Sequence, residues 1–206
     1  MAKLNLGVLL SGNGRTLQNI INRIKKGELP AQVRVVVSSR EDAGGVVIAK
    51  KEGIDVFVVS PQQLRGDTFS EKIASILSKY EIDLVIMAGF LHFFKISEKY
   101  QGKVLNIHPA LIPSFCGKGY YGHYVHEAVL KSGVKISGCT VHFADNTYDN
   151  GPIILQKTVP VMDDDTPQTL AERVFTAECE AYPEAIQLFA RGRLKIVGGK
   201  TLILEE

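Results

Sequence analysis

The regular alternation of short apolar runs with segments of helical periodicity constrains the fold more than any other feature of the sequence. Five runs have the length and the apolar content expected of buried strands: Leu4–Leu10, Val33–Val37, Asp55–Val59, Leu84–Ala88 and Val104–His108. The segments between them carry apolar residues at helical spacing, and the clearest set is Leu17, Ile20, Ile21 and Ile24. Strands that alternate with helices predict a doubly wound, mostly parallel α/β sheet of the Rossmann-like class.

The second half of the chain continues this pattern with one change. Strands predicted over Val134–Phe143 and Ile153–Val161 follow one another closely, which favours an antiparallel pair. Thr166-Pro167 predicts the start of a long last helix, and the tail from Arg191 predicts a small hairpin. Because no repeat or linker interrupts the sequence, we expect a single domain over residues 1–206. Thr16 is the predicted N-cap of the first helix.

Two polar residues stand at the end of the fifth predicted strand. Asn106 and His108 are two positions apart, and strand side chains alternate between faces, so both point to the same side. Polar groups there cost stability unless they meet partners or a ligand. An amide beside an imidazole suits a reaction in which a carbonyl oxygen becomes negative, because both groups stabilise that charge and the imidazolium donates a proton. A hydrogen-bonded pair without a catalytic role is the alternative.

A glycine-rich turn, Ser11-Gly12-Asn13-Gly14-Arg15-Thr16, follows the first predicted strand. It leads into a helix N-terminus, where backbone N–H groups and the helix dipole favour an anion, and Arg15 adds a cationic fork for phosphate. Leu17 stands where a dinucleotide fingerprint requires its third glycine, and the Lys-Ser/Thr pair of a P-loop is missing. The turn therefore predicts a site for a single phosphate, with a tight turn that binds no ligand as the alternative.

Further candidate residues follow from the predicted topology. The glycine turn, Gly89-Phe90 and the Asn106/His108 pair all come at carboxyl ends of predicted strands, where open α/β sheets bind ligands. The apolar patch after the fourth strand (Leu91, Phe93 and Phe94) suits a flat heteroaromatic ligand. Glu178 lies on the apolar stripe of the last helix, so its carboxylate needs a partner such as a substrate amine.

Composition and spacing argue against several classes of function. A net charge of +2 without a dense block of Lys and Arg argues against a nucleic-acid partner. No apolar run is long enough to cross a membrane or to form a signal core, so we expect a cytoplasmic protein. The three cysteines, Cys116, Cys139 and Cys179, are widely spaced, odd in number and include no CxxC pair, so neither a structural zinc site nor a disulfide framework is indicated. We expect His123 and His126 on a solvated helix face.

Four motifs together resemble the folate-dependent formyltransferases, and among them the phosphoribosylglycinamide formyltransferase family. They are Ser11-Gly12-Asn13-Gly14, Ala88-Gly89-Phe90, Asn106-Ile107-His108-Pro109, and Val141-His142-Phe143 followed by Asp149-Asn150-Gly151-Pro152. They span essentially the whole chain, in order and with similar spacing. The pairing of Asn-x-His-Pro with the later Asp-x-Gly-Pro is the most specific feature.

The resemblance implies transfer of the formyl group of 10-formyltetrahydrofolate to the glycine amine of 5′-phosphoribosylglycinamide, in purine biosynthesis and without a metal. It implies small-molecule partners, with no nucleic acid and no membrane, and a monomer or a homodimer. The N-terminal half would bind phosphate, and the C-terminal half would bind folate and carry the chemistry. Catalytic roles fall on Asn106, His108 and Asp149. Substrate contacts fall on Gly12, Gly14, Arg15, Thr16 and Glu178, and folate contacts on Arg65, Leu91, His92, Phe93, Phe94 and Asn106.

In the implied reaction, Asn106 and protonated His108 stabilise the oxyanion, and the nearby carboxylate of Asp149 favours the charged imidazole. The chain departs from the best-known family members at Arg15-Thr16, where they carry Ser-Asn, and at His92, where they carry Arg. We therefore expect its contacts with phosphate and folate to differ from theirs.

Three alternatives stay open from the sequence. One is hydrolysis of formyltetrahydrofolate by the same three residues, although the family's hydrolases carry an additional N-terminal domain that we do not expect here. The second is a non-catalytic domain that binds phosphate or an NADP-type ligand, with Arg40 placed after the second strand. The third is a thiol enzyme that pairs Cys116 with His108.

Overall fold

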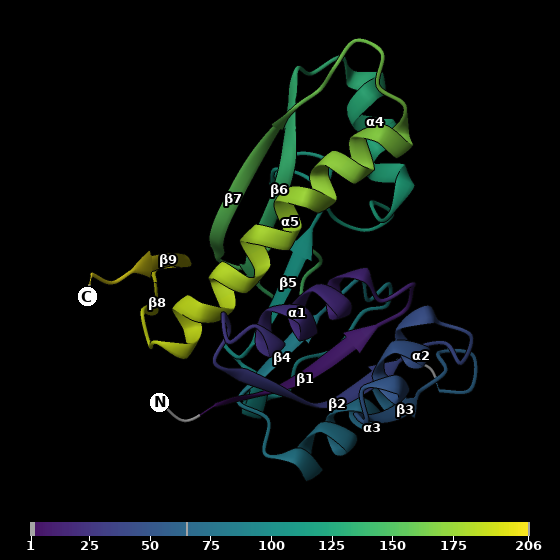
Figure 1. Cartoon of the computed structure of the whole chain (residues 1–206), viewed down its shortest axis with the longest axis vertical. Helices are drawn as coiled ribbons and strands as arrows, with labels where there is room; N and C mark the ends of the chain where they lie inside the picture. The colour runs from purple at the N-terminus through teal and green to yellow at the C-terminus, as the bar shows by residue number, and fades with distance from the viewer. Residues whose placement is uncertain (1–2, 65, 206) are drawn as a thin grey trace. The chain divides into compact units, whose positions relative to one another are not determined.

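The computed structural model describes residues 3–64 and 66–205. Their strands form a seven-stranded sheet in the order β3-β2-β1-β4-β5-β6-β7 and a separate two-stranded sheet, β8-β9 (Figure 1). The mostly parallel α/β sheet predicted from the alternation of strands and helices is thereby confirmed. The chain divides into two compact units, the first ending at Leu105 and the second beginning at Asn106.

The first unit holds four parallel strands and the helices between them. Its elements are β1 (Leu4–Leu10), α1 (Arg15–Lys25), β2 (Ala31–Ser38), α2 (Gly44–Lys51), β3 (Asp55–Val58), α3 (Asp67–Leu77), η1 (Ser78–Tyr80), β4 (Leu84–Met87) and η2 (Glu98–Tyr100). β1 pairs in parallel with both β2 and β4, so that Leu9 lies opposite Val37 and Met87. The carboxyl ends of these three strands therefore lie side by side, and their buried apolar side chains form the core of the unit.

The first helix begins two residues earlier than predicted. Gly14, not Thr16, is the N-cap of α1, and it adopts the left-handed conformation with φ of 76°. A Cβ atom on Gly14 would lie 2.5 Å from the Cα atom of Gly45, so the turn is shaped by two backbones in contact. The prediction of Thr16 as N-cap was wrong because the start of α1 depends on the close approach of Gly14 to Gly45 and not on a side-chain cap.

The second unit holds an antiparallel pair of strands and the longest helix. Its elements are β5 (Val104–His108), which spans the boundary, α4 (His123–Ser132), β6 (Ile136–Phe143), β7 (Ile153–Pro160), α5 (Pro167–Ala190), β8 (Leu194–Val197) and β9 (Lys200–Ile203). β6 and β7 pair in antiparallel fashion, as predicted, and α5 packs along both (Figure 1). The hairpin expected after Arg191 is also confirmed, as β8-β9.

The start of α5 shows why its N-terminus is well defined by the sequence. The Thr166 hydroxyl accepts a hydrogen bond from the backbone N–H of Thr169, and the Thr169 hydroxyl accepts one from the Thr166 backbone. Pro167 follows at the first helical position, where it needs no N–H partner. Over the described part of the chain, no helix, α5 included, has both the length and the apolarity required to span a membrane.

One histidine of α4 lies in a different environment from the one expected. His123 is exposed, but His126 is only 4% exposed, and its Nδ1 atom has no hydrogen-bond partner. The buried valines Val125 and Val129 mark the inner face of the helix, and His126 lies between them. Burial, together with the charge of His108, lowers the pKa of His126 to about 4. The expectation of a solvated face was therefore wrong for His126.

We expect this buried imidazole to make the protein sensitive to acid. Because the pKa of His126 falls from 6.5 to about 4 on folding, the unfolded chain binds the proton more strongly between these values. The free energy of unfolding should therefore decrease as the pH falls through this range. Urea denaturation at about pH 7 and about pH 5 should show a loss that is about 2 kcal/mol smaller in His126→Gln than in the unsubstituted protein. His123→Gln, at an exposed position, should behave like the unsubstituted protein; equal losses in all three proteins would contradict the prediction.

Candidate active site

Four polar side chains meet in the second unit, where β5 ends. Asn106 and His108 come from β5, His142 from β6, and Asp149 from the loop between β6 and β7. The Asp149 carboxylate bridges the β5 pair, because its Oδ1 atom lies 3.3 Å from Asn106 Nδ2 and its Oδ2 atom lies 3.6 Å from His108 Nδ1. The His108 side chain is 4% exposed and that of Asp149 is 12% exposed, so this charge acts in a largely water-free environment.

Sequence reasoning assigned no role to His142, although this residue stood in one of the quoted motifs. Its Nδ1 atom lies 2.9 Å from the Phe143 carbonyl oxygen, which can only accept, so we assign the ring proton to Nδ1. Its Nε2 atom then accepts from Asn106 Nδ2 at 3.1 Å. Burial lowers the pKa of His142, which favours the neutral ring that this arrangement requires. The signal that could have identified His142 is the presence of an ionisable residue in the buried strand β6.

A loop contributes two further contacts to these side chains. His108 Nε2 lies 2.8 Å from the Phe115 carbonyl oxygen and donates to it, while the Gly117 N–H donates to Asp149 Oδ2 at 2.9 Å. Both hydrogens of the Asn106 amide are directed at acceptors, one on His142 and one on Asp149. Hydrogen bonds therefore join the Asn106 amide to both His142 and Asp149 within the cluster. A substrate oxygen that displaced one of these bonds would meet an amide and an imidazole as donors, which suits the stabilisation of an oxyanion.

The glycine turn lies in the first unit, between β1 and α1. Gly12 and Arg15 are exposed, Thr16 is half-buried, and Gly14 is buried. The Gly45 N–H donates to the Gly12 carbonyl oxygen at 3.2 Å, which fixes the turn against α2. No acidic residue occupies the first turn of α1, so the positive end of the helix dipole is not neutralised locally.

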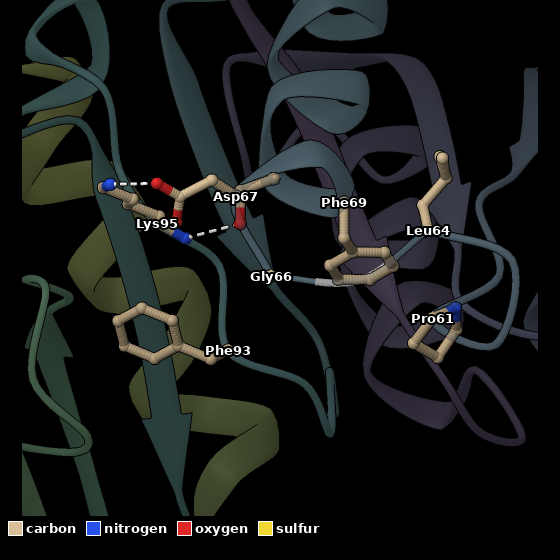
Figure 2. A pocket seen from close by; sticks show the side chains of 8 residues that line it. Pro61, Leu64, Gly66, Asp67, Phe69, Phe93 and Lys95 are labelled. Atoms are coloured by element: carbon tan, nitrogen blue, oxygen red, sulfur yellow. Dashed lines mark hydrogen bonds and ion pairs between the residues drawn. The ribbon is translucent and has the colours of Figure 1, made fainter.

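The segment that follows β4 lies beside a cavity in the same unit. Leu91 and Phe93 are exposed, His92 is half-buried and Phe94 is buried. The cavity has a volume of about 330 Å³ and is lined by Pro61, Leu64, Gly66, Asp67, Phe69, Ser70, Phe93 and Lys95 (Figure 2). Figure 2 shows Lys95 joined to Asp67, at an Nζ–Oδ2 distance of 2.5 Å. Arg65, for which the resemblance implies a folate contact, lies outside the described residues.

The remaining candidates lie in the second unit. Glu178 is half-buried on α5, and its charge adds to burial in raising the pKa of the Cys139 thiol to about 12. Cys116 donates to the Pro113 carbonyl oxygen at 3.3 Å. Burial and the charge of Asp149 raise the pKa of the Cys116 thiol, which disfavours the thiolate that a thiol enzyme requires. The structure therefore argues against the pairing of Cys116 with His108 as a catalytic dyad.

Comparison with known proteins connects this geometry to one family. The sequence profile of the family described as formyl transferase matches residues 4–186. The phosphoribosylglycinamide formyltransferase of Escherichia coli is 36% identical over 94% of this chain and 90% of its own. The trifunctional purine biosynthetic protein adenosine-3 of Gallus gallus is 39% identical over 94% of this chain, which spans 19% of that protein's length.

A solved structure is similar over nearly the whole chain. The crystal structure of glycinamide ribonucleotide transformylase 1 from Symbiobacterium toebii has a TM-score of 0.91 and 39% sequence identity. The similarity covers 98% of this chain and 95% of that one.

Proposed function

The chain belongs to the formyl transferase family, and we propose that it transfers the formyl group of 10-formyltetrahydrofolate to the glycine amine of 5′-phosphoribosylglycinamide, a step of purine biosynthesis. The observation that carries the proposal is the carboxylate of Asp149, which bridges the Asn106 amide and the His108 imidazole. The similarity to the phosphoribosylglycinamide formyltransferase of Escherichia coli and to the glycinamide ribonucleotide transformylase of Symbiobacterium toebii supports the choice of substrate.

The proposed reaction passes through a tetrahedral intermediate. The neutral amine attacks the formyl carbon, and the electron pair of the carbonyl bond moves to the oxygen, which accepts hydrogen bonds from Asn106 and from protonated His108. The Asp149 carboxylate, 3.6 Å from His108 Nδ1, stabilises the positive imidazole. Collapse of the intermediate breaks the bond between the formyl carbon and N10 of the folate. The leaving nitrogen gains a proton, and the attacking nitrogen loses one to water.

We assign ligand binding to the residues that the resemblance implied. The turn from Gly12 to Thr16 and the N-terminus of α1 would hold the phosphate, and Glu178 would bind the amine-bearing substrate. Leu91–Phe94 would contact the folate rings. The family profile spans residues 4–186, which supports a single functional domain built from both compact units.

The experiment that tests the proposal separates transfer from hydrolysis. Purified protein is incubated with 10-formyltetrahydrofolate, with and without 5′-phosphoribosylglycinamide, and the release of tetrahydrofolate is followed by absorbance. We expect release only when the amine is present, together with formation of the formylated ribonucleotide. A rate that does not depend on the amine would instead identify a formyltetrahydrofolate hydrolase.

Replacement of Arg15 should affect binding of the phosphorylated substrate. The guanidinium is exposed at the first position of α1, where it would add a charge-assisted hydrogen bond to phosphate. We expect Arg15→Ala to raise the KM for 5′-phosphoribosylglycinamide about tenfold, with little change in kcat or in the KM for the folate. Arg34→Ala, which removes an exposed arginine from the middle of β2, is the control. An unchanged KM in Arg15→Ala would argue against phosphate at this turn.

A further inference from the structure

Serine hydroxyls fix the backbone at both ends of the segment from Leu91 to Lys95. The Leu91 N–H donates to Ser11 Oγ at 3.0 Å, and the Lys95 N–H donates to Ser70 Oγ at 2.9 Å. Both serines are buried, with 2% and 4% of their surface exposed. The segment between them has no regular secondary structure, and its Leu91 and Phe93 side chains are exposed. The two serine contacts therefore fix the backbone at both ends of this segment, in addition to the burial of the Phe94 side chain and the contacts of the His92 ring with aromatic neighbours.

Ser11 also belongs to the end of β1, directly before the glycine turn. Its backbone N–H donates to the Gly89 carbonyl oxygen at 3.1 Å, which links it to the end of β4. Its hydroxyl oxygen accepts a second hydrogen bond from Ser39 Oγ at 2.7 Å, which links it to the end of β2. One buried hydroxyl thus connects three neighbouring strand ends, and the next residue in the chain, Gly12, begins the turn.

We propose that Ser11 is a positioning residue that couples phosphate binding at the turn to folate binding at Leu91–Phe94. The inference rests on the proposed function, from which it takes the two ligands. An anion held by the N–H groups of the turn restrains the backbone at Gly12 and hence at Ser11, and the Ser11 hydroxyl in turn restrains the Leu91 amide. Because the segment is already restrained, it loses less conformational entropy when folate binds, and folate therefore binds more tightly. The coupling is reciprocal, so bound folate strengthens phosphate binding by the same factor.

Titration calorimetry with tetrahydrofolate measures this coupling without turnover, because tetrahydrofolate carries no formyl group. The Kd of tetrahydrofolate is determined for the protein alone and in saturating 5′-phosphoribosylglycinamide. We expect the unsubstituted protein to bind tetrahydrofolate about fivefold more tightly when the ribonucleotide is present. In Ser11→Ala the ratio of the two Kd values should fall toward one, because the side-chain bond from the turn to the Leu91 amide is lost, although the backbone bond from Ser11 to Gly89 remains.

Two further variants separate this coupling from a loss of stability. Like Ser11→Ala, Ser39→Ala removes the buried hydrogen bond between Ser11 and Ser39, but it leaves the bond from Leu91 to Ser11 intact. We therefore expect Ser39→Ala to keep the ratio of Kd values of the unsubstituted protein. Ser70→Ala frees the other end of the segment, and it should weaken tetrahydrofolate binding equally in both conditions. Melting temperatures of Ser11→Ala and Ser39→Ala show whether the two variants are equally stable.

Three results would overturn the inference. They are a ratio of one in the unsubstituted protein, an unchanged ratio in Ser11→Ala, and an equal loss of the ratio in Ser11→Ala and Ser39→Ala. If the unsubstituted protein bound neither ligand, the proposed function would fail and the inference would fail with it. If it bound both ligands independently, the inference alone would fail.

Discussion

His108→Ala is expected to reduce kcat for formyl transfer by about 10³-fold, within the range measured for removal of a general acid. The imidazole is buried, and in the proposed reaction it is the group that brings both a positive charge and a hydrogen-bond donor to the developing oxyanion. Its loss leaves Asn106 as the remaining donor from β5. The KM values should change little, because the interaction is made mainly in the transition state. Steady-state kinetics under saturation with both substrates measures the effect.

His123→Ala provides the matched control, since it removes an exposed histidine from the same unit. It should retain the kcat of the unsubstituted protein. Circular dichroism should show that His108→Ala keeps its secondary structure, although it loses the hydrogen bond to Phe115. Transfer at the unsubstituted rate by a folded His108→Ala protein would remove the imidazole from the mechanism.

Asp149→Asn should lower kcat by about 10²-fold to 10³-fold, the range found when one preorganised electrostatic group is removed. The two carboxylate oxygens accept from two different donors, the Asn106 amide and the Gly117 N–H. An amide has one oxygen, so its NH₂ group would face a donor and one of these bonds would be lost. The negative charge beside His108 disappears as well. Asparagine is nevertheless a suitable replacement, because Asp149 has a φ of 49° and asparagine adopts this conformation readily.

Asp145→Asn is the corresponding control, because it removes the same charge from the same loop. Asp145 accepts from the Thr147 N–H at 2.8 Å and from the Asn150 amide at 3.4 Å, and neither bond involves Asn106 or His108. We expect it to keep kcat within about threefold of the unsubstituted value, as is usual for substitutions outside special sites. Similar losses in both variants would show that loop geometry, and not the carboxylate at residue 149, controls the rate.

Most of the fold followed from periodicity, which a single sequence displays directly. The continuous valines of β2 and the apolar stripe of α1 predicted a buried strand and an amphipathic helix. Thr166-Pro167 predicted the start of α5, because capping depends on neighbours in the chain. The N-terminus of α1 was misplaced because it depends on Gly45, far away in the sequence. Local pattern therefore predicts the type of an element better than its boundaries.

The candidate site could be predicted only in part, for a similar reason. Period two along β5 placed Asn106 and His108 on one face, and the resemblance added Asp149. His142 was missed as a partner of Asn106, because the periodicity of one strand does not show which residues of another strand lie beside it. His126 was misplaced because i,i+3 spacing relates it to His123 and does not say which side the helix buries. Both errors concern contacts between segments that are distant in the sequence, which the pattern of a single sequence does not show.

The contact between Gly14 and Gly45 has a consequence for how the protein can diverge. The main chain of this turn cannot take another course unless α2 moves, so we expect related proteins to keep the same backbone conformation here. Arg15 is exposed and Thr16 is half-buried, so replacing either side chain does not disturb the contact between the two glycine backbones. If the turn binds phosphate as proposed, substitution of these two residues can change the preference among phosphate esters while the backbone of the turn stays the same.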